Sequence, residues 1–233
     1  YVWGWGDCNK NIRNMPANKL TYTKKSILNS NPQGDILCVT NADIINYLHT
    51  QYPMPVEKHF LDFTNDVISI HGSLNNEPRK YFRYRLYHTN YNRTTWGVEY
   101  KFTESGLGKL VDKRGVSFHD RVNNCRLAII VYGQNTTMYE TLSANFPTML
   151  FWNPDHWELR EEAKPYFDLL EQSGVYHTNV HSLCEKINEV YENVDKWWQS
   201  ESTQKAVKTF CEKYAFTGED HIADWVRELE NHT

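Results

Sequence analysis

Hydrophobic and polar positions along the chain predict five strands separated by helices. Residues 127–132 form a continuous apolar run rich in β-branched side chains, as in a parallel strand buried on both faces. Residues 81–87 instead alternate, with Arg83 and Arg85 on one side and aromatic or aliphatic side chains on the other. Shorter apolar runs predict the remaining strands, at residues 36–40, 148–152 and 175–177.

Apolar positions recur at helical spacing between these strands. The helix after the 127–132 run follows a turn at residues 133–137 and ends before Pro147. Glycines interrupt every period over residues 92–115, which we expect to form an insertion or an irregular hairpin. Because strands and helices alternate, the pattern predicts the α/β class, a Rossmann-like three-layer domain with a mostly parallel sheet. The other expected helices are a short helix or turn at residues 43–48 and helices at 55–74, 157–173, 181–199, 201–214 and 219–230.

A change of composition near residue 35 predicts a domain boundary. Residues 1–34 are rich in Asn, Lys, Gly and Trp and show no sustained period, so we expect a linker or the tail of a preceding domain. Residues 35–233 then form the Rossmann-like domain, which is long enough to bury a full core. The chain begins Tyr-Val-Trp without a methionine, and we therefore expect a piece of a longer polypeptide.

The turn before the central helix is the strongest candidate for a ligand site. Asn135, Thr136 and Thr137 lie where the first N–H groups of a helix lack partners and its dipole is positive, which favours a phosphate. Glu140, expected on the first helical turn, can accept hydrogen bonds from a ribose diol. The alternative is that Asn135 or Thr136 only caps the helix, with Glu140 completing a capping box.

Two further side chains are candidates for catalysis. Arg85 lies near the carboxyl end of its strand, where ligands bind in open α/β sheets, and its guanidinium can pair with a phosphate or a sugar carboxylate. The competing interpretation of Arg85 is a surface ion pair. His119, just before the central strand, is a candidate donor to a leaving phosphate, with a purely structural histidine as the alternative.

The order of motifs resembles a known family. Residues 126–177 resemble the donor-binding half of GT-B glycosyltransferases and, more narrowly, the bacterial LIC12162 transferase family, which is related to transferases of capsular and surface polysaccharides. The likeness extends over roughly residues 80–225. It rests on Thr-Thr-x-x-Glu-Thr-Leu-x-x-Asn-x-Pro-Thr from Thr136 to Thr148, the Leu-Arg-x-x-Ala-x-Pro-Tyr-Phe-Asp run from Leu159, the pair Trp197 and Trp198, and the Arg-Tyr-Arg-Leu-Tyr segment from Arg83.

This resemblance implies that residues 35–233 are a nucleotide-sugar binding domain, the C-terminal half of a GT-B-like fold. It implies a glycosyltransferase that moves a sugar from a nucleotide-activated donor to a glycan or lipid-linked acceptor. In this interpretation Asn135, Thr136 and Thr137 hold a phosphate and Glu140 holds the ribose. Two alternatives stay open: a transferase of polyol phosphate from a CDP-activated donor in teichoic-acid-like synthesis, and a non-catalytic nucleotide-binding module.

Missing motifs and the charge balance exclude several other classes. A net charge of −4 gives no basic field for nucleic acid. The sequence has no G-x-x-x-x-G-K-[ST] and no G-x-G-x-x-G after a strand, which argues against a kinase, an ATPase and a simple dehydrogenase. It has no G-x-S-x-G, which argues against a serine hydrolase. It also shows no Asp-x-Asp motif and no tight cluster of metal ligands. We therefore expect a metal-independent transfer with no cofactor besides the donor substrate.

Cysteine usage and hydropathy bear on the compartment. Five cysteines without C-x-x-C spacing favour a reducing environment over a disulfide framework or a structural zinc site. No apolar run approaches the roughly 20 residues of a membrane-spanning helix. We expect a cytoplasmic location, at the inner face of the membrane if regions outside this chain bind there.

Overall fold

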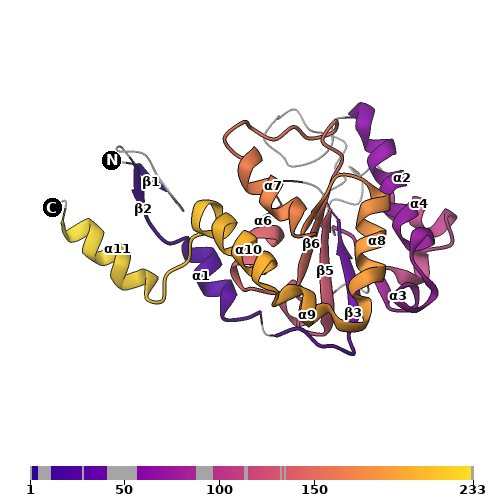
Figure 1. The fold of residues 1–233 in the computed structure, drawn as a ribbon, viewed down its shortest axis with the longest axis horizontal. Coiled ribbons are helices and arrows are strands. Elements are labelled where there is room, and N and C mark those ends of the chain that lie inside the picture. The colour runs from indigo at the N-terminus through magenta and orange to yellow at the C-terminus, as the bar shows by residue number, and fades with distance from the viewer. Residues whose placement is uncertain are drawn as a thin grey trace.

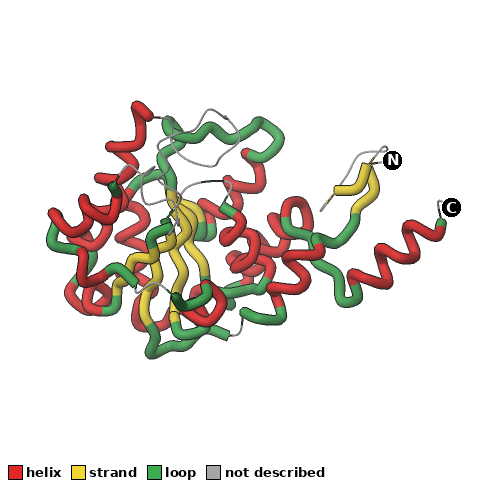
Figure 2. Tube along the Cα trace, turned by 180° about the vertical axis from the view of Figure 1, so that it is seen from behind, coloured by secondary structure: helices red, strands yellow, loops and turns green. Residues whose placement is uncertain are grey.

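A sheet of five parallel strands forms the centre of the molecule, with helices on both faces (Figures 1 and 2). The computed structural model describes residues 2–4, 12–27, 29–40, 57–87, 97–112, 115–131, 133 and 135–231. The α/β class and the parallel sheet predicted from the sequence are confirmed. The strands lie in the order β4 (Phe82–Arg85), β3 (Asp35–Val39), β5 (Cys125–Val131), β6 (Thr148–Phe151) and β7 (Tyr176–His177).

Burial explains the two strand patterns in the sequence. All seven residues of β5 are buried, because β5 pairs with β3 on one side and β6 on the other and is covered on both faces. At the edge, β4 alternates: Phe82 and Tyr84 are fully buried, whereas Arg83 and Arg85 are only half-buried. The predicted alternation is therefore confirmed, and it places both arginines on the less covered face of the edge strand.

The helices form two layers. On one face α2 (Glu57–Ser73) packs against α8 (Val180–Val190). On the other face α10 (Glu201–Tyr214) packs against α6 (Thr136–Ser143) and α7 (Lys164–Gln172). The chain runs from β3 outward to β4, then returns past β3 to β5 and continues the other way. The strand order therefore reverses between β3 and β5, at a topological switch point.

Shorter elements complete the described structure. The helices α3 (Asn76–Lys80) and α5 (Phe118–Val122) flank β4 and precede β5 along the chain. The remaining helices are α4 (Val98–Glu104), α9 (Val194–Trp198), α11 (His221–Glu230) and the 3-10 turns Gly108–Leu110 and Tyr191–Asn193. In the described parts of the chain, no helix combines the length and apolar character needed to cross a bilayer.

The N-terminal segment contacts the domain that follows it. The helix α1 (Asn18–Lys24) packs against α6 and α11, and a small apolar cluster joins Ala17 and Leu20 to Ala215. The short parallel strands β1 (Val2–Gly4) and β2 (Ile12–Asn14) pair with each other and lie toward α11 in Figure 1. The predicted boundary at residue 34 stays a prediction, but α1 is held on the surface of the 35–233 unit.

Two of the expected helices differ from those observed. The helix expected at residues 157–173 begins only at Lys164, because Pro165 lacks an N–H group and fits the first helical turn but not the interior. Residues 153–163 form turns, with Asn153 Oδ1 accepting from the Asp155 N–H. The single helix expected at 181–199 is broken at Asn193, whose side chain accepts from Lys196 and starts α9.

The segment expected to be an irregular hairpin is helical where the structure describes it. Within residues 97–112 the chain forms α4 and a 3-10 turn, and glycines stand at the helix ends rather than in a hairpin loop. Gly97 at the N-terminal end of α4 has φ +73°, a left-handed conformation that favours glycine. The helix expected at residues 43–48 lies outside the described residues. The helices near 55–74, 201–214 and 219–230 are confirmed.

Trp197 and Trp198, the pair that contributes to the family resemblance, bind the ends of two helices. The Trp197 indole donates to the Ser173 carbonyl and the Trp198 indole donates to the Asn145 carbonyl, both at 2.9 Å. These two carbonyls belong to the ends of α7 and α6. Trp198 is fully buried, so the pair holds the C-terminal ends of two helices against the core.

One buried histidine makes the stability of the fold depend on pH. His177 ends β7, and its Nε2 lies 3.0 Å from the Gly174 carbonyl oxygen. Burial lowers the pKa of His177 to about 4, while the Gly174 hydrogen bond partly opposes that shift. The unfolded chain thus binds a proton at higher pH than the folded chain. The contribution of neutral His177 to the free energy of unfolding is fully present above about pH 6.5 and is lost as the pH falls toward 4.

We predict that wild-type protein loses unfolding free energy between pH 6.5 and 4 with a contribution from His177 of at most about 1.4 kcal/mol per pH unit. The variant His177→Gln lacks the titrating ring and should show a shallower pH dependence. Urea unfolding of both proteins across this range measures the difference. The exposed variant His181→Gln serves as the control. Parallel pH profiles for wild type and His177→Gln would contradict the prediction.

Candidate functional site

A cavity of about 430 Å³ opens at the carboxyl ends of β3 and β4, beside the N-terminus of α6. This is the sheet edge at the switch point, where ligands bind in open α/β folds. Four of the residues predicted from the sequence meet in this cavity: Arg85, Asn135, Thr136 and Thr137. The other lining residues are Lys19, Val39, Thr40, Leu86, Tyr87 and Phe118.

The N-terminus of α6 forms one wall of the cavity. Asn135 caps this helix, since its Oδ1 accepts from the Thr137 N–H at 3.0 Å. The capping interpretation is therefore confirmed for Asn135, and the same residue also lines the cavity. The proposed capping box is wrong: Glu140 lies on the second turn of α6, not the first, and its side chain points to other partners.

The turn before α6 is shaped by a close approach of another segment. Gly133 is buried, and a Cβ atom at this position would lie 2.8 Å from the indole nitrogen of Trp157. Trp157 belongs to the 153–163 segment between β6 and α7. That segment therefore packs directly on the β5–α6 turn, and only glycine leaves enough room there.

Glu140 lies behind the cavity rather than in its lining. Its side chain is 7% exposed, with Oε1 2.9 Å from Lys19 Nζ and Oε2 3.5 Å from His119 Nε2. Lys19 has a 64% exposed side chain and does line the cavity, so it connects the buried carboxylate to the open space. Sequence reasoning missed Lys19, although Ala17 and Leu20 beside it have the spacing of an apolar helix face.

His119 faces Glu140. Its helix, α5, is capped by Ser117, whose hydroxyl accepts from the Asp120 N–H at 3.1 Å. The Nε2 atom of His119 is buried and makes no hydrogen bond within the described structure, and it lies 3.5 Å from Glu140 Oε2. The neighbouring Phe118 lines the cavity, whereas His119 does not. Its direct role as a proton donor to a phosphate stays a prediction.

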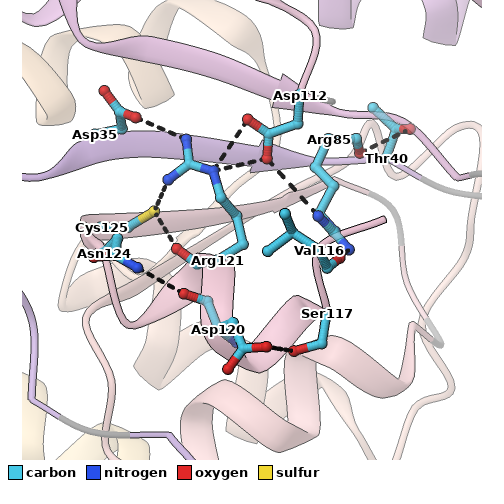
Figure 3. A network of polar contacts seen from close by, with 10 residues as sticks. All are labelled: Asp35, Thr40, Arg85, Asp112, Val116, Ser117, Asp120, Arg121, Asn124 and Cys125. Atoms are coloured by element: carbon cyan, nitrogen blue, oxygen red, sulfur yellow. Dashed lines mark hydrogen bonds and ion pairs between the residues drawn. The ribbon is translucent and has the colours of Figure 1, made fainter. Parts of the chain in front are cut away.

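Arg85 is held in a network of charges at the edge of the sheet (Figure 3). Its Nη2 donates to the Val116 carbonyl at 2.7 Å, and its Nη1 lies 3.8 Å from Asp112 Oδ2. Asp112 is bound more closely by Arg121, whose Nε lies 2.8 and 3.0 Å from the two carboxylate oxygens. Arg121 also reaches Asp35 at 2.7 Å. Arg85 is thus a half-buried cation that shares its counter-ion.

Burial and charge act on Arg85 in opposite directions. Burial lowers the pKa of Arg85, and the neighbouring Asp112 raises it. The guanidinium remains protonated at physiological pH because its ordinary pKa is so high. Arg83, on the same face of β4, behaves differently: its Nη1 donates to the carbonyls of Lys80 and Phe82 near the amino end of the strand. Only Arg85 of this pair lines the cavity.

The lining favours an anionic ligand. Lys19 and Arg85 contribute two cationic groups, and no described carboxylate lines the cavity. Their counter-ions, Glu140 and Asp112, lie behind them. The positive end of the α6 dipole and the threonine hydroxyls add further donors of the kind that bind phosphate.

Comparisons with known proteins relate the chain to transferases. No curated protein matches it. Two solved structures are similar: WaaG, a glycosyltransferase involved in lipopolysaccharide biosynthesis (11% identity, 87% of this chain, 52% of that chain, TM-score 0.41), and the wall teichoic acid polymerase TagF with CDPG (11%, 98%, 52%, 0.45). The chain spans about half the length of each. The family model for LIC12162 family transferases matches residues 1–229. The chain belongs to the LIC12162 family of transferases.

Proposed function

We propose that this chain is the donor-binding part of a glycosyltransferase that takes a sugar from a nucleotide-activated donor and passes it to a surface-glycan acceptor. The observation that carries the proposal is the cationic cavity at the switch point, with Arg85, Lys19 and the N-terminus of α6 around it. Membership of a transferase family supports group transfer. The resemblance of residues 126–177 to GT-B donor-binding halves supports the nucleotide sugar as donor.

The proposed chemistry follows from the charges in the cavity. When the bond between the sugar and the phosphate breaks, negative charge develops on the leaving phosphate, and fixed cations and oriented donors stabilise it. Arg85 offers a planar fork of donors for two phosphate oxygens, and Lys19 offers a point charge at the rim. We assign Thr136 and Thr137 to the same phosphate. Arg85 and Lys19 supply the positive charge that a metal ion provides in other transferases.

We assign Glu140 to the ribose of the donor. Each carboxylate oxygen accepts more than one hydrogen bond, so Glu140 can keep its contacts with Lys19 and His119 and still accept from a hydroxyl. A competing role is that Glu140 only positions Lys19 for the phosphate. Nucleosides, which carry a ribose but no phosphate, distinguish these two roles.

The first prediction on the site concerns Thr137. The variant Thr137→Val keeps the shape of the side chain and removes one hydroxyl donor, so nucleoside diphosphate binding should weaken by about 0.5–1.5 kcal/mol. Isothermal titration calorimetry measures the change, with Thr103→Val on α4 as a matched control away from the cavity. Unchanged affinity in a folded Thr137→Val protein would mean that this residue serves the helix alone.

The second prediction separates Arg85 from its neighbour. Arg85→Ala removes a charged donor and should weaken nucleotides by about 1.5–3 kcal/mol while leaving nucleosides nearly unaffected. Arg83→Ala is the control on the same face of the same strand, and its affinities should match wild type. Arg85→Lys keeps the charge and should fall between the two. Equal losses for nucleotides and nucleosides, at an unchanged unfolding midpoint, would refute a phosphate role for Arg85.

The third prediction tests Glu140. Glu140→Gln keeps the volume of the side chain but removes its charge, and a ribose contact predicts a similar fold-loss for a nucleoside and for its matching diphosphate. Calorimetry with both ligands measures the ratio. A loss confined to the diphosphate would instead show that Glu140 acts through Lys19, and the ribose assignment would be wrong.

A further inference from the structure

Two histidines and an aspartate converge at the carboxyl edge of the sheet. His59 and Asp62 stand one turn apart on α2, so their side chains share a helix face. His156 comes from the segment between β6 and α7, which Figure 1 shows at the same edge of the sheet as the amino end of α2. One ligand atom from each residue lies within 4.8 Å of the other two. None of the three lines the cavity described above.

The side chains have the chemistry of a transition-metal site. Two imidazole nitrogens and one carboxylate oxygen suit zinc or a similar divalent ion better than magnesium or calcium, which prefer oxygen ligands. The two imidazole rings are stacked, with centroids 4.7 Å apart and planes 29° apart, so their nitrogens start close together. Ligands at about 2.0–2.1 Å from a tetrahedral ion stand about 3.3 Å apart, so the ligand atoms need to close by no more than about 1.5 Å.

Exposure of the three residues permits that closure. His59 and His156 are half-buried and Asp62 is exposed, so their side chains can rotate toward a shared ion and leave a fourth position to water. Asp66 lies one turn further along α2. Burial raises the pKa of Asp66, and the charge interaction with His156 opposes that rise, so the two side chains lie near each other. Two carboxylates thus lie beside the two imidazoles, and together they favour a cation.

We propose that His59, Asp62 and His156 bind one divalent transition-metal ion, with zinc as the reference member of the class. The ion ties α2 to the segment between β6 and α7. Trp157 follows His156 directly and packs on Gly133 in the turn before α6, so the bound ion also steadies one neighbour of the cavity. The expectation of a metal-independent transfer stays a prediction, because the proposed ion lies outside the lining of the cavity. The three residues of the metal site lie far apart in the sequence and meet only in the fold.

Metal titration tests the site directly. Protein freed of metal with a chelator is titrated with zinc by calorimetry, and with cobalt(II), which absorbs visible light when four-coordinate. We expect one ion per chain. Loss of a residue that only hydrogen-bonds to a metal ligand weakens metal binding by about 10–100-fold. Removing a ligand itself, as in His156→Ala and Asp62→Asn, should therefore weaken zinc binding more than about tenfold. The control His181→Ala removes an exposed histidine paired with Glu185 on α8 and should bind as wild type does.

The outcomes are decisive in either direction. Stoichiometric zinc binding that both variants weaken and His181→Ala leaves unchanged supports the site. Zinc binding that survives in Asp62→Asn and His156→Ala, or that His181→Ala weakens equally, overturns it. So does the absence of stoichiometric binding in wild type. Asp62 is exposed, so Asp62→Asn keeps the fold testable if His156→Ala does not fold.

Discussion

The parallel pairing of β3 with β5 is the constraint on which the site depends. Ile36, Leu37 and Cys38 face the fully buried residues of β5, and each buried aliphatic side chain contributes about 1.5–3 kcal/mol. An exposed ion pair contributes about 0–1 kcal/mol, and the attraction within a more buried pair is offset by the cost of removing its charges from water. The apolar pairing therefore fixes the reversal of strand order and the cavity at its end. The charged residues around that cavity contribute little to the fold, so their chemistry can serve ligand binding.

The cations of the cavity are held in place before any ligand arrives. Lys19 is paired with buried Glu140, and Arg85 is steadied by the Val116 carbonyl and by a share of Asp112. Asp112 lies closer to Arg121 than to Arg85, which leaves part of the Arg85 fork without a close carboxylate. An anion that enters the cavity meets oriented donors that need little rearrangement, the condition under which electrostatic stabilisation is most effective.

The sequence was sufficient for the sheet because burial imposes a pattern on each strand. A strand covered on both faces is apolar over most of its length, as β5 is from Leu127 to Val131, and an edge strand alternates, as β4 does. Helix boundaries were less predictable, since the periodicity of residues 157–163 resembles a helix and only the position of Pro165 argues against one. The interruption of the helix expected at residues 181–199 depends on a single capping residue, Asn193.

The candidate site likewise combines residues that the sequence could predict with residues that it could not. Arg85 ends β4, and Asn135, Thr136 and Thr137 follow β5, so their convergence could be predicted from topology. Lys19 could not, because it reaches the cavity from a segment whose packing against α6 is not encoded in its own short period. The partnership of Glu140 with His119, and that of His59 with His156, depends on tertiary contacts that no local pattern reveals.

The central claim is that the cavity at the switch point binds the phosphates of a nucleotide-activated donor. A thermal-shift panel of CMP, CDP, UDP, GDP, their sugars, the matching nucleosides and a CDP-activated polyol tests it most directly, since a ligand that binds only the folded state raises the unfolding midpoint. We predict a concentration-dependent rise for one nucleoside diphosphate and its sugar, larger than for the matching nucleoside. A rise confined to the CDP-activated polyol would show that the donor is a CDP-activated polyol and not a nucleotide sugar. No rise with any nucleotide would contradict the claim.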